Sequence, residues 1–269
     1  MKRVAAIQMA SGPNIDANLN EAARSINAAA NAGAGLVVLP ENFALMANVE
    51  TDWVKFAEKD GSGKIQDFLS EQASQNKVWI IGGTIPIKGN RTDKARAACI
   101  VYDDTGKRIS RYDKIHLFDV EIVDSNENYT ESRTIEAGDD VVVIETPFGK
   151  LGIAICYDLR FPELFRSLLE KGAEIFAIPS AFTAITGKAH WEVIVRARAI
   201  ENLSYVIAAA QGGYHINGRE THGDSMIVDP WGTIIDRLPR GSGFVIADID
   251  EERLANIRRH FPAIDHRKL

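Results

Sequence analysis

Apolar residues along the chain alternate between the spacing of buried strands and that of helices packed on a sheet. Residues 3–9 and the run GLVVLP at 35–40 predict strands, and residues 14–32 carry apolar side chains at helical spacing. Gly33 follows the helical segment, as is common just beyond a helix C-terminus. The chain therefore opens with a strand, a helix and a second strand, and Glu41 follows that second strand.

The same two patterns continue to the C-terminus. Further strands are expected at 78–87, 97–103, 107–115, 141–146, 151–156, 174–180, 204–211, 225–229, 233–238 and 244–249, and further helices at 64–76, 162–171 and 188–202. Each half reads approximately as strand, helix, strand, helix and then several strands. Between them, residues 119–140 are polar and aperiodic, and a loop of that length is more often functional than not.

So many apolar strands are best buried by two sheets that pack together with helices on their outer faces. We therefore expect an α/β fold of the four-layer α-β-β-α sandwich type, with a doubly wound single sheet as the main alternative. No linker divides the chain, so residues 1–269 are expected to form a single domain. The final segment, about 258–269, carries Phe261 and Ile264, and we expect it to dock on a second subunit.

The net charge of the chain indicates which partners to expect, and its cysteine content indicates the cellular compartment. The formal net charge is −6, from mixed signs without a basic stripe, so neither nucleic acid nor an anionic membrane surface is an expected partner. No apolar run has the length of a membrane span, and the N-terminal run is too short for a signal peptide. With two cysteines and no disulfide pattern, a cytoplasmic location is expected, and Cys99 is interpreted as an ordinary strand residue.

The segment GIAICYDLRFP, residues 152–162, carries the strongest chemical signal. An apolar strand stops at Cys156, and a helix begins at Pro162. A strand that ends in a reactive atom and leads into a helix is the geometry of a nucleophile elbow. The helix dipole would favour the thiolate there. The alternative is that Cys156 is a small buried hydrophobic residue.

Covalent catalysis by cysteine also needs a base and donors for an oxyanion. None of the six histidines stands in a setting typical of a cysteine-protease partner. Glu41, at a strand end beside apolar residues, is the better base, because such burial can raise a carboxyl pKa toward working pH. Lys114, placed between a glutamate and a thiolate, could hold the carboxylate and stabilise an anionic intermediate. The alternatives are a capping glutamate and a solvated surface lysine.

Metal catalysis is not indicated by the histidine spacing. His215 and His222 flank a glycine-containing loop and have no nearby Cys or His companion on a regular element. We therefore expect no metal site.

Three segments of the chain resemble the signature segments of the nitrilase superfamily of carbon–nitrogen hydrolases. They are LPENF around Glu41, RYDKIHLFD around Lys114 and GIAICYDLRFPEL around Cys156. The resemblance spans essentially the whole chain, in the right order. It implies a Glu41–Lys114–Cys156 triad, an α-β-β-α sandwich, homodimers or higher homo-oligomers, and neither a metal nor an organic cofactor.

The resemblance also implies a second catalytic glutamate after the lysine segment. Glu131, in YTES, matches best. The run VDSNENYT lacks the Pro-Gly pair expected in this loop, so Glu121 and Glu127 stay as alternatives.

Other segments resemble the branch of the superfamily that hydrolyses small ω-amides of 2-oxo acids. They are PSAFTAITGKAHWEVIVRARAIEN, AAAQGG, DPWGTI and RRHFPAIDHR, and they are most similar to deaminated glutathione amidases. The implied substrate is a small-molecule amide, cleaved through a thioester. The alternatives are an ω-amidase acting on 2-oxoglutaramate or 2-oxosuccinamate, an N-carbamoyl-amine hydrolase and a non-catalytic scaffold.

A 2-oxo acid amide carries a carboxylate that needs a cation or several donors in a pocket. Arg160, four residues after the nucleophile, could bind it bidentately, and Thr186, in the loop expected after the strand at 174–180, could add a hydroxyl. The backbone N–H of Tyr157 is expected to bind the oxyanion. The alternative for Arg160 is an ion pair with a neighbouring carboxylate, Asp158 or Glu163, that would fix the elbow.

Overall fold

Two β-sheets packed face to face form the centre of the protein, in a computed structural model that describes residues 2–122 and 127–268. The first sheet has the strand order β17-β1-β2-β3-β5-β4, with β6 also paired to β5. Its strands are β1 (Lys2–Gln8), β2 (Leu36–Val38), β3 (Trp79–Ile81), β4 (Ile85–Lys88), β5 (Ala95–Tyr102), β6 (Arg108–Asp113) and β17 (Gly243–Ile249).

The second sheet has the order β16-β15-β12-β11-β10-β9. Its strands are β9 (Val143–Thr146), β10 (Gly149–Ile153), β11 (Ile175–Ser180), β12 (Tyr205–Ala210), β15 (Ser225–Val228) and β16 (Ile234–Leu238). Strands β10, β11 and β12 run parallel to one another, and β9, β15 and β16 are antiparallel to their neighbours.

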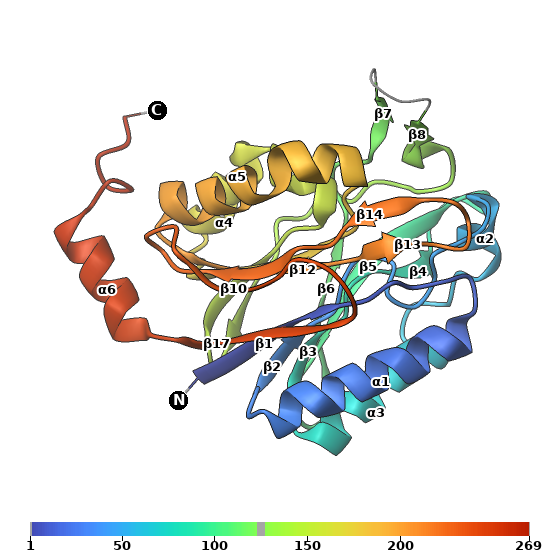
Figure 1. The fold of residues 1–269 in the computed structure, drawn as a ribbon, viewed down its shortest axis with the longest axis horizontal. Helices are drawn as coiled ribbons and strands as arrows, with labels where there is room; N and C mark the ends of the chain where they lie inside the picture. The colour runs from blue at the N-terminus through green and yellow to red at the C-terminus, as the bar shows by residue number, and fades with distance from the viewer. Residues whose placement is uncertain (1, 123–126, 269) are drawn as a thin grey trace.

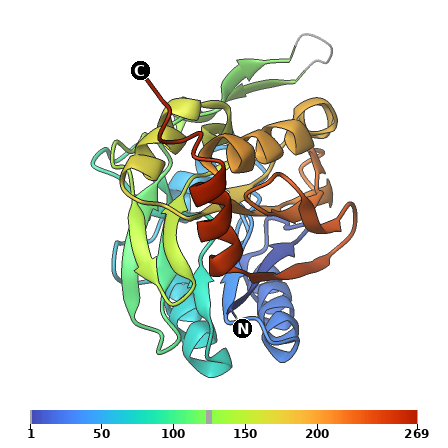
Figure 2. The same ribbon diagram turned by 90° about the vertical axis from the view of Figure 1, so that its left-hand side faces the viewer.

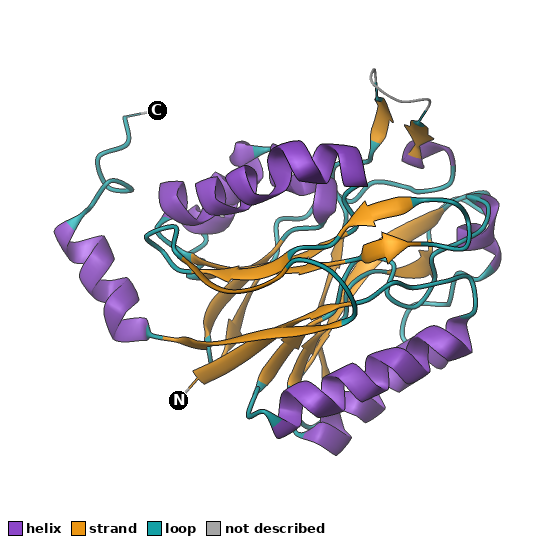
Figure 3. Ribbon diagram, viewed as in Figure 1, coloured by secondary structure: helices purple, strands orange, loops and turns teal. Residues whose placement is uncertain are grey.

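Helices cover the outer face of each sheet, which completes four layers (Figures 1 and 3). Helices α1 (Ile15–Asn31) and α3 (Lys64–Asn76) lie on the first sheet, and α4 (Pro162–Glu170) and α5 (Ala184–Asn202) lie on the second. The α-β-β-α sandwich expected from the sequence is therefore present. No helix in the described ranges is long and apolar enough to cross a membrane.

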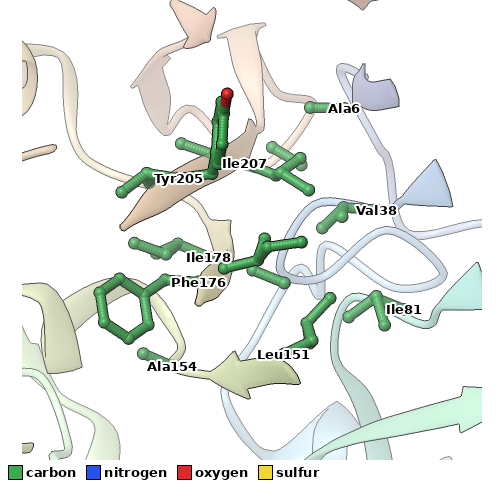
Figure 4. Packing of buried hydrophobic residues seen from close by; sticks show 14 of the residues in the cluster. Ala6, Val38, Ile81, Leu151, Ala154, Phe176, Ile178, Tyr205 and Ile207 are labelled. Atoms are coloured by element: carbon green, nitrogen blue, oxygen red, sulfur yellow. The ribbon is translucent and has the colours of Figure 1, made fainter. Parts of the chain in front are cut away.

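Burial on both faces explains why the strands read as continuous apolar runs. In β1, Val4 and Ala6 belong to the cluster between the two sheets, whereas Ala5 and Ile7 belong to the cluster beneath α1 and α3. Figure 4 shows the cluster between the sheets, where side chains from both inner faces meet.

The smaller elements lie at the ends of the sandwich. They are α2 (Thr51–Lys55), α6 (Glu251–His260), the hairpin of β7 (Asp119–Glu121) and β8 (Asn128–Thr130), the hairpin of β13 (Gly212–Tyr214) and β14 (Glu220–His222), and 3-10 helices at Glu131–Arg133 and Cys156–Arg160. The polar stretch 119–140 thus contains a hairpin and a 3-10 turn, where only irregular chain was expected. Residues 123–126 of that stretch lie outside the described residues.

The C-terminal segment begins inside α6 and packs partly on its own chain. Arg258 donates to the carbonyl oxygens of Leu203 and Ala173. Phe261 makes an edge contact with Trp231 at 5.3 Å between ring centroids, and both rings stay about half exposed. Figure 2 shows α6 running across the side of the sandwich. The expected docking on a second subunit stays a prediction, and Leu269 lies outside the described residues.

The strand expected at 78–87 is divided into β3 and β4 by a glycine corner. Gly83 has a φ of +57°, and a Cβ there would lie 2.2 Å from the carbonyl oxygen of Pro40. The corner therefore packs directly against the residue that precedes Glu41. The apolar periodicity of residues 78–87 cannot predict this contact, because the contact involves a segment about forty residues earlier in the chain.

Replacement of Gly83 by alanine should lower the free energy of unfolding by more than about 2 kcal/mol, from backbone strain combined with overlap. The matched control is Gly61→Ala, since Gly61 also has a positive φ, of +84°, but has nothing within 4 Å of an added Cβ. Strain alone should cost that variant about 1 kcal/mol. Urea unfolding measures both, and equal losses would contradict the close-packing explanation.

Candidate active site

Three predicted site residues meet at the ends of strands from both sheets. Glu41 follows β2, Lys114 follows β6, and Cys156 follows β10 at the start of a 3-10 helix. All three are at least nine-tenths buried. Glu131, from the 3-10 helix after the β7–β8 hairpin, joins them.

The Lys114 ammonium bridges two carboxylates. Its Nζ lies 2.8 Å from Glu41 Oε1, and 3.0 Å and 2.8 Å from the two oxygens of Glu131. Burial by itself lowers the pKa of Lys114, but the charges of Glu131 and Glu41 outweigh it and raise that pKa well above its ordinary value. Lys114 is therefore a fixed cation at neutral pH.

Glu131 is held at this position by the backbone as well. Its Oε2 accepts the N–H of Phe118 at 2.7 Å. Burial, opposed by Lys114 and reinforced by Glu41, raises the pKa of Glu131. Of the two alternatives for the second glutamate, Glu127 accepts from the Tyr129 hydroxyl, and Glu121 lies in exposed β7. The contact with Lys114 thus belongs to Glu131.

Cys156 occupies a sharp corner of the backbone. Its φ is +47°, in the left-handed region that a residue with a side chain rarely adopts. Strain of this kind is characteristic of nucleophile elbows. The strand ends at Ile153, so the cysteine lies on a 3-10 turn rather than on the strand end that was expected.

Burial raises the pKa of the Cys156 thiol well above its ordinary value, and the Glu41 charge raises it further. The Glu41 side chain raises the pKa of the thiol, while Lys114 and the backbone of Ala181 lower it. The expectation that a helix dipole would favour the resting thiolate is therefore wrong. Because the thiol is protonated, it needs a base to become a nucleophile, and Glu41 lines the same cavity.

A buried carboxylate fixes the corner. Asp158 is fully buried and accepts from the Tyr112 hydroxyl at 2.6 Å, from Ile155 N at 2.8 Å and from the backbone N–H of His116 at 2.9 Å. The His116 ring Nδ1 also lies 2.7 Å from it. Asp158 thus connects the elbow to the segment around Lys114, and sequence reasoning, which considered it only as a partner of Arg160, missed this role.

Glu41, Lys114, Glu131 and Cys156 line a cavity of about 470 Å³, and Tyr157 lines it as well. Arg160 lines it too, with its guanidinium carbon 5.3 Å from the Phe182 ring centroid and Nη1 3.3 Å from His190 Nδ1. Within the described part of the chain, no carboxylate forms an ion pair with Arg160. The alternative pairing with Asp158 or Glu163 is therefore not observed.

Thr186 lines the same cavity but lies in the first turn of α5 rather than in a loop. The helix begins at Ala184, four residues before the expected start, because the Thr183 hydroxyl caps it by accepting the Thr186 N–H. The two hydroxyls are 2.8 Å apart.

Two other residues of the site, one behind Glu41 and one on the cavity wall, were missed by sequence reasoning. Gln211 donates to the carbonyl oxygen of Glu41 at 3.0 Å and so supports the backbone of the proposed base. Arg219 lines the cavity from the β13–β14 hairpin. A polar residue in a short hairpin carries no periodic signal, although the charge in the run HINGRE could have suggested a pocket residue.

His215 and His222, considered above as metal ligands, have other partners. His215 Nδ1 lies 2.7 Å from the Ser11 carbonyl oxygen, and its Nε2 lies 2.7 Å from Thr221 Oγ1. Burial lowers the pKa of His215, so the ring is neutral at pH 7. His222 lies beside the buried Asp224 at 3.7 Å.

Comparison with known proteins places this site in a family. Residues 3–259 match the carbon–nitrogen hydrolase family. The chain is 44% identical over 266 residues to the deaminated glutathione amidase of Synechocystis sp., a match that covers 98% of this chain and 97% of that protein. The chain belongs to the carbon–nitrogen hydrolase family.

Solved structures agree with this membership. The Caenorhabditis elegans NitFhit protein has a TM-score of 0.92 at 34% identity, over 99% of this chain and 65% of that one. Saccharomyces cerevisiae Nit3, a nitrilase-superfamily member, has a TM-score of 0.89 at 33% identity, over 100% of this chain and 97% of that one. The nitrilase-like fold and the superfamily resemblance are confirmed, and the protein is an amide-hydrolysing enzyme that acts on a small molecule. The roles of individual residues stay predictions.

The charge of Glu41 predicts a pH effect on the Cys156 thiol. Because the Glu41 charge raises the pKa of Cys156, Glu41→Gln should lower it, and the thiolate absorbance should appear at lower pH than in the wild type. Ultraviolet titration measures this, with Cys156→Ala as the baseline for Cys99. Glu50→Gln, at the cavity rim, is the matched control. An unchanged or upward-shifted titration in Glu41→Gln would show that the two groups do not interact.

Proposed function

We propose that this hydrolase is a cysteine-dependent amidase of the deaminated glutathione type, which cleaves the ω-amide bond of a small 2-oxo acid amide through a thioester. The observation that carries the proposal is that the buried Cys156 thiol shares one cavity with Glu41, whose carboxylate accepts a hydrogen bond from Lys114. Its relatives from Synechocystis sp. and Homo sapiens, which are named deaminated glutathione amidases, support the substrate class.

In the proposed mechanism, Glu41 takes the Cys156 proton as the sulfur attacks the amide carbon. The oxyanion that forms is stabilised by the Lys114 ammonium and the backbone N–H of Tyr157. Glu41 then gives the proton to the leaving amine, which departs and leaves a thioester. Water, deprotonated by Glu41, adds to the thioester and releases the acid and the thiol.

Glu131 acts in this mechanism as a positioning residue. Its two contacts with Lys114 fix the ammonium opposite Glu41. This role needs no proton transfer by Glu131. Burial of Lys114 between two carboxylates also keeps water from screening the ammonium, which strengthens its field at the oxyanion.

A panel of ω-amides of 2-oxo acids, N-carbamoyl amines and nitriles tests the proposal. The wild type should hydrolyse an ω-amide of a 2-oxo acid best, and a trapped acyl-enzyme should carry its added mass on Cys156. Cys156→Ala should fold normally and lose activity by at least about 10⁴-fold, since the nucleophile is gone. Cys99→Ala is the matched control and should keep activity. Near-wild-type turnover by Cys156→Ala, or preference for a carbamoyl amine, would refute the assignment.

Recognition of the acyl carboxylate is proposed for Arg160 with Thr186. The support is that both line the cavity and that Arg160 has no carboxylate partner in the described residues. A charge-assisted pair with a substrate carboxylate would satisfy that guanidinium.

Arg160→Met should cost about 2–4 kcal/mol in kcat/KM for an acidic 2-oxo amide, and much less for a neutral amide or ester. The ratio of the two kcat/KM values is the measurement. Arg133→Met, an arginine of the neighbouring 3-10 helix that does not line the cavity, is the control. Equal damage to the acidic and neutral substrates would mean that Arg160 supports the Cys156 corner instead.

We also propose a cytoplasmic homodimer or higher homo-oligomer. The interface is proposed to lie over α5 and the Trp231–Phe261 pair. Its support is exposed apolar surface, which comes from the half-exposed rings of that pair and from Val193 and Ile200 of α5.

A further inference from the structure

The peptide group between Glu41 and Asn42 is held on both sides by buried side chains. Its carbonyl oxygen, which belongs to Glu41, accepts from Gln211 Nε2 at 3.0 Å. Its N–H, which belongs to Asn42, donates to the Thr84 hydroxyl at 2.8 Å. Gln211 and Thr84 are both completely buried. The peptide group that follows the proposed base therefore has both of its polar atoms bound by side chains.

The two side chains come from different sheets. Gln211 directly follows β12 of the second sheet, and Thr84 lies between β3 and β4 of the first. The other two members of the proposed triad are divided in the same way, since Cys156 follows β10 and Lys114 follows β6. The two hydrogen bonds therefore fix the backbone of Glu41 relative to the sheet that carries the nucleophile and to the sheet that carries the ammonium.

Further hydrogen bonds set the orientation of the Gln211 amide. Its Oε1 accepts the backbone N–H of Ser11 at 3.0 Å, so Nε2 is the atom turned toward Glu41. Nε2 also donates to the Ser11 hydroxyl at 2.8 Å, and that hydroxyl donates to the Phe43 carbonyl oxygen at 2.8 Å. Both polar atoms of the Gln211 side chain thus have partners, and a buried network that is fully satisfied is rigid.

The backbone immediately after the base is strained. Asn42 has a φ of +60°, in the left-handed region, which asparagine tolerates better than most residues. Such a conformation persists only where the surrounding structure holds it. The Thr84 hydroxyl accepts the Asn42 N–H and lies 3.4 Å from Asn42 Oδ1. Loss of this hydroxyl would therefore release a strained corner beside Glu41 and allow the base to shift.

The far end of the Glu41 side chain is held separately, because its Oε1 accepts from Lys114 Nζ at 2.8 Å. A glutamate side chain is flexible, and ordering it costs conformational entropy. Holding both the main chain and the carboxylate orders it before a substrate enters. A base has to lie within hydrogen-bond reach of the proton it takes, and a displacement of about 1 Å can cost on the order of 100-fold in rate.

We infer that Thr84 and Gln211 are positioning residues for the base. By holding the peptide group between residues 41 and 42, they fix where the Glu41 carboxylate lies relative to the Cys156 sulfur. Neither residue lines the cavity, so both act through Glu41 and not on the substrate. This inference rests on the proposed function, in which Glu41 is the base, and adds to it the two side chains that keep the base in place.

Thr84→Val and Thr84→Ser test the inference, because valine has nearly the shape of threonine without its hydroxyl and serine keeps the hydroxyl. The substrate is the ω-amide of 2-oxoglutarate. Thr84→Val should reduce kcat by roughly 10- to 100-fold and leave KM within about threefold, since the substrate itself loses no contact. Thr84→Ser should recover most of the lost kcat.

Ser204→Ala is the matched control. Ser204 is also completely buried, and its hydroxyl donates to the Asn202 carbonyl oxygen and accepts from Arg258. It lies just before β12, at the opposite end of that strand from Gln211. Ser204→Ala should lower the free energy of unfolding, measured with urea, and keep the wild-type kcat per folded enzyme. A buried hydroxyl with a merely structural role would behave in this way at position 84 too.

Gln211→Met, which removes the amide and keeps a side chain of similar length, should reduce kcat by a factor similar to that of Thr84→Val. Because both residues hold the same peptide group, releasing it twice should cost little more than releasing it once. The variant that combines both changes should therefore lose much less kcat than the product of the two single losses. Losses that multiply would show that the two residues do not act on one group and would overturn the inference.

Comparison with Glu41→Gln separates this inference from the proposed function. If Glu41→Gln is inactive while Thr84→Val and Gln211→Met keep the wild-type kcat per folded enzyme, the inference is overturned and the amidase assignment stands. If the wild type hydrolyses no ω-amide of a 2-oxo acid, or if Glu41→Gln keeps its turnover, the proposed function itself fails. Should Gln211→Met not fold, the kcat of Thr84→Val against that of Thr84→Ser decides, and equal values would overturn the inference.

Discussion

The buried ammonium of Lys114 is the interaction on which the site depends. A lone cation at this depth would be strongly unfavourable, and so would two adjacent carboxylates. Together they are tolerable, because Glu41 and Glu131 each contact the same Nζ. The cluster also ties three separate segments of the chain to one point, so the geometry around Cys156 follows from satisfying a charge as much as from packing apolar side chains.

In this arrangement, the Cys156 thiol is activated by a proton transfer. Burial keeps the Cys156 thiol protonated and unreactive, and the Glu41 charge adds to that effect. The same Glu41 that suppresses ionisation at rest is the group in position to accept the proton during attack. The nucleophile is therefore formed only as the reaction proceeds, and the Asp158 network holds the strained corner on which this occurs.

The local spacing of apolar residues was sufficient to predict much of the fold. The helix at 64–76 agrees with α3, because its apolar face and ends are set by nearby residues. The strand at 78–87 was not divided correctly, since the corner at Gly83 depends on the distant Pro40. The β13–β14 hairpin was missed for the same reason, as His215 holds it through Ser11, about two hundred positions earlier. Within the site, the sequence motifs predicted the roles of Glu41, Lys114 and Cys156. The role of Asp158 and the position of Arg219 in the cavity depend on contacts between distant segments, which no local pattern encodes.

The pairing of β1 with β17 has a consequence for how the chain acquires its structure. Lys2 lies opposite Ile249 and Gln8 opposite Gly243, so β1 pairs on one side with β17, which is synthesised long after it. Until then, β1 presents an open edge of unpaired amides that could pair with another nascent chain. Completion of the first sheet is necessarily a late, long-range event, which slows folding. Truncation before residue 243 would therefore remove β17 and leave the edge of β1 exposed for pairing with another chain.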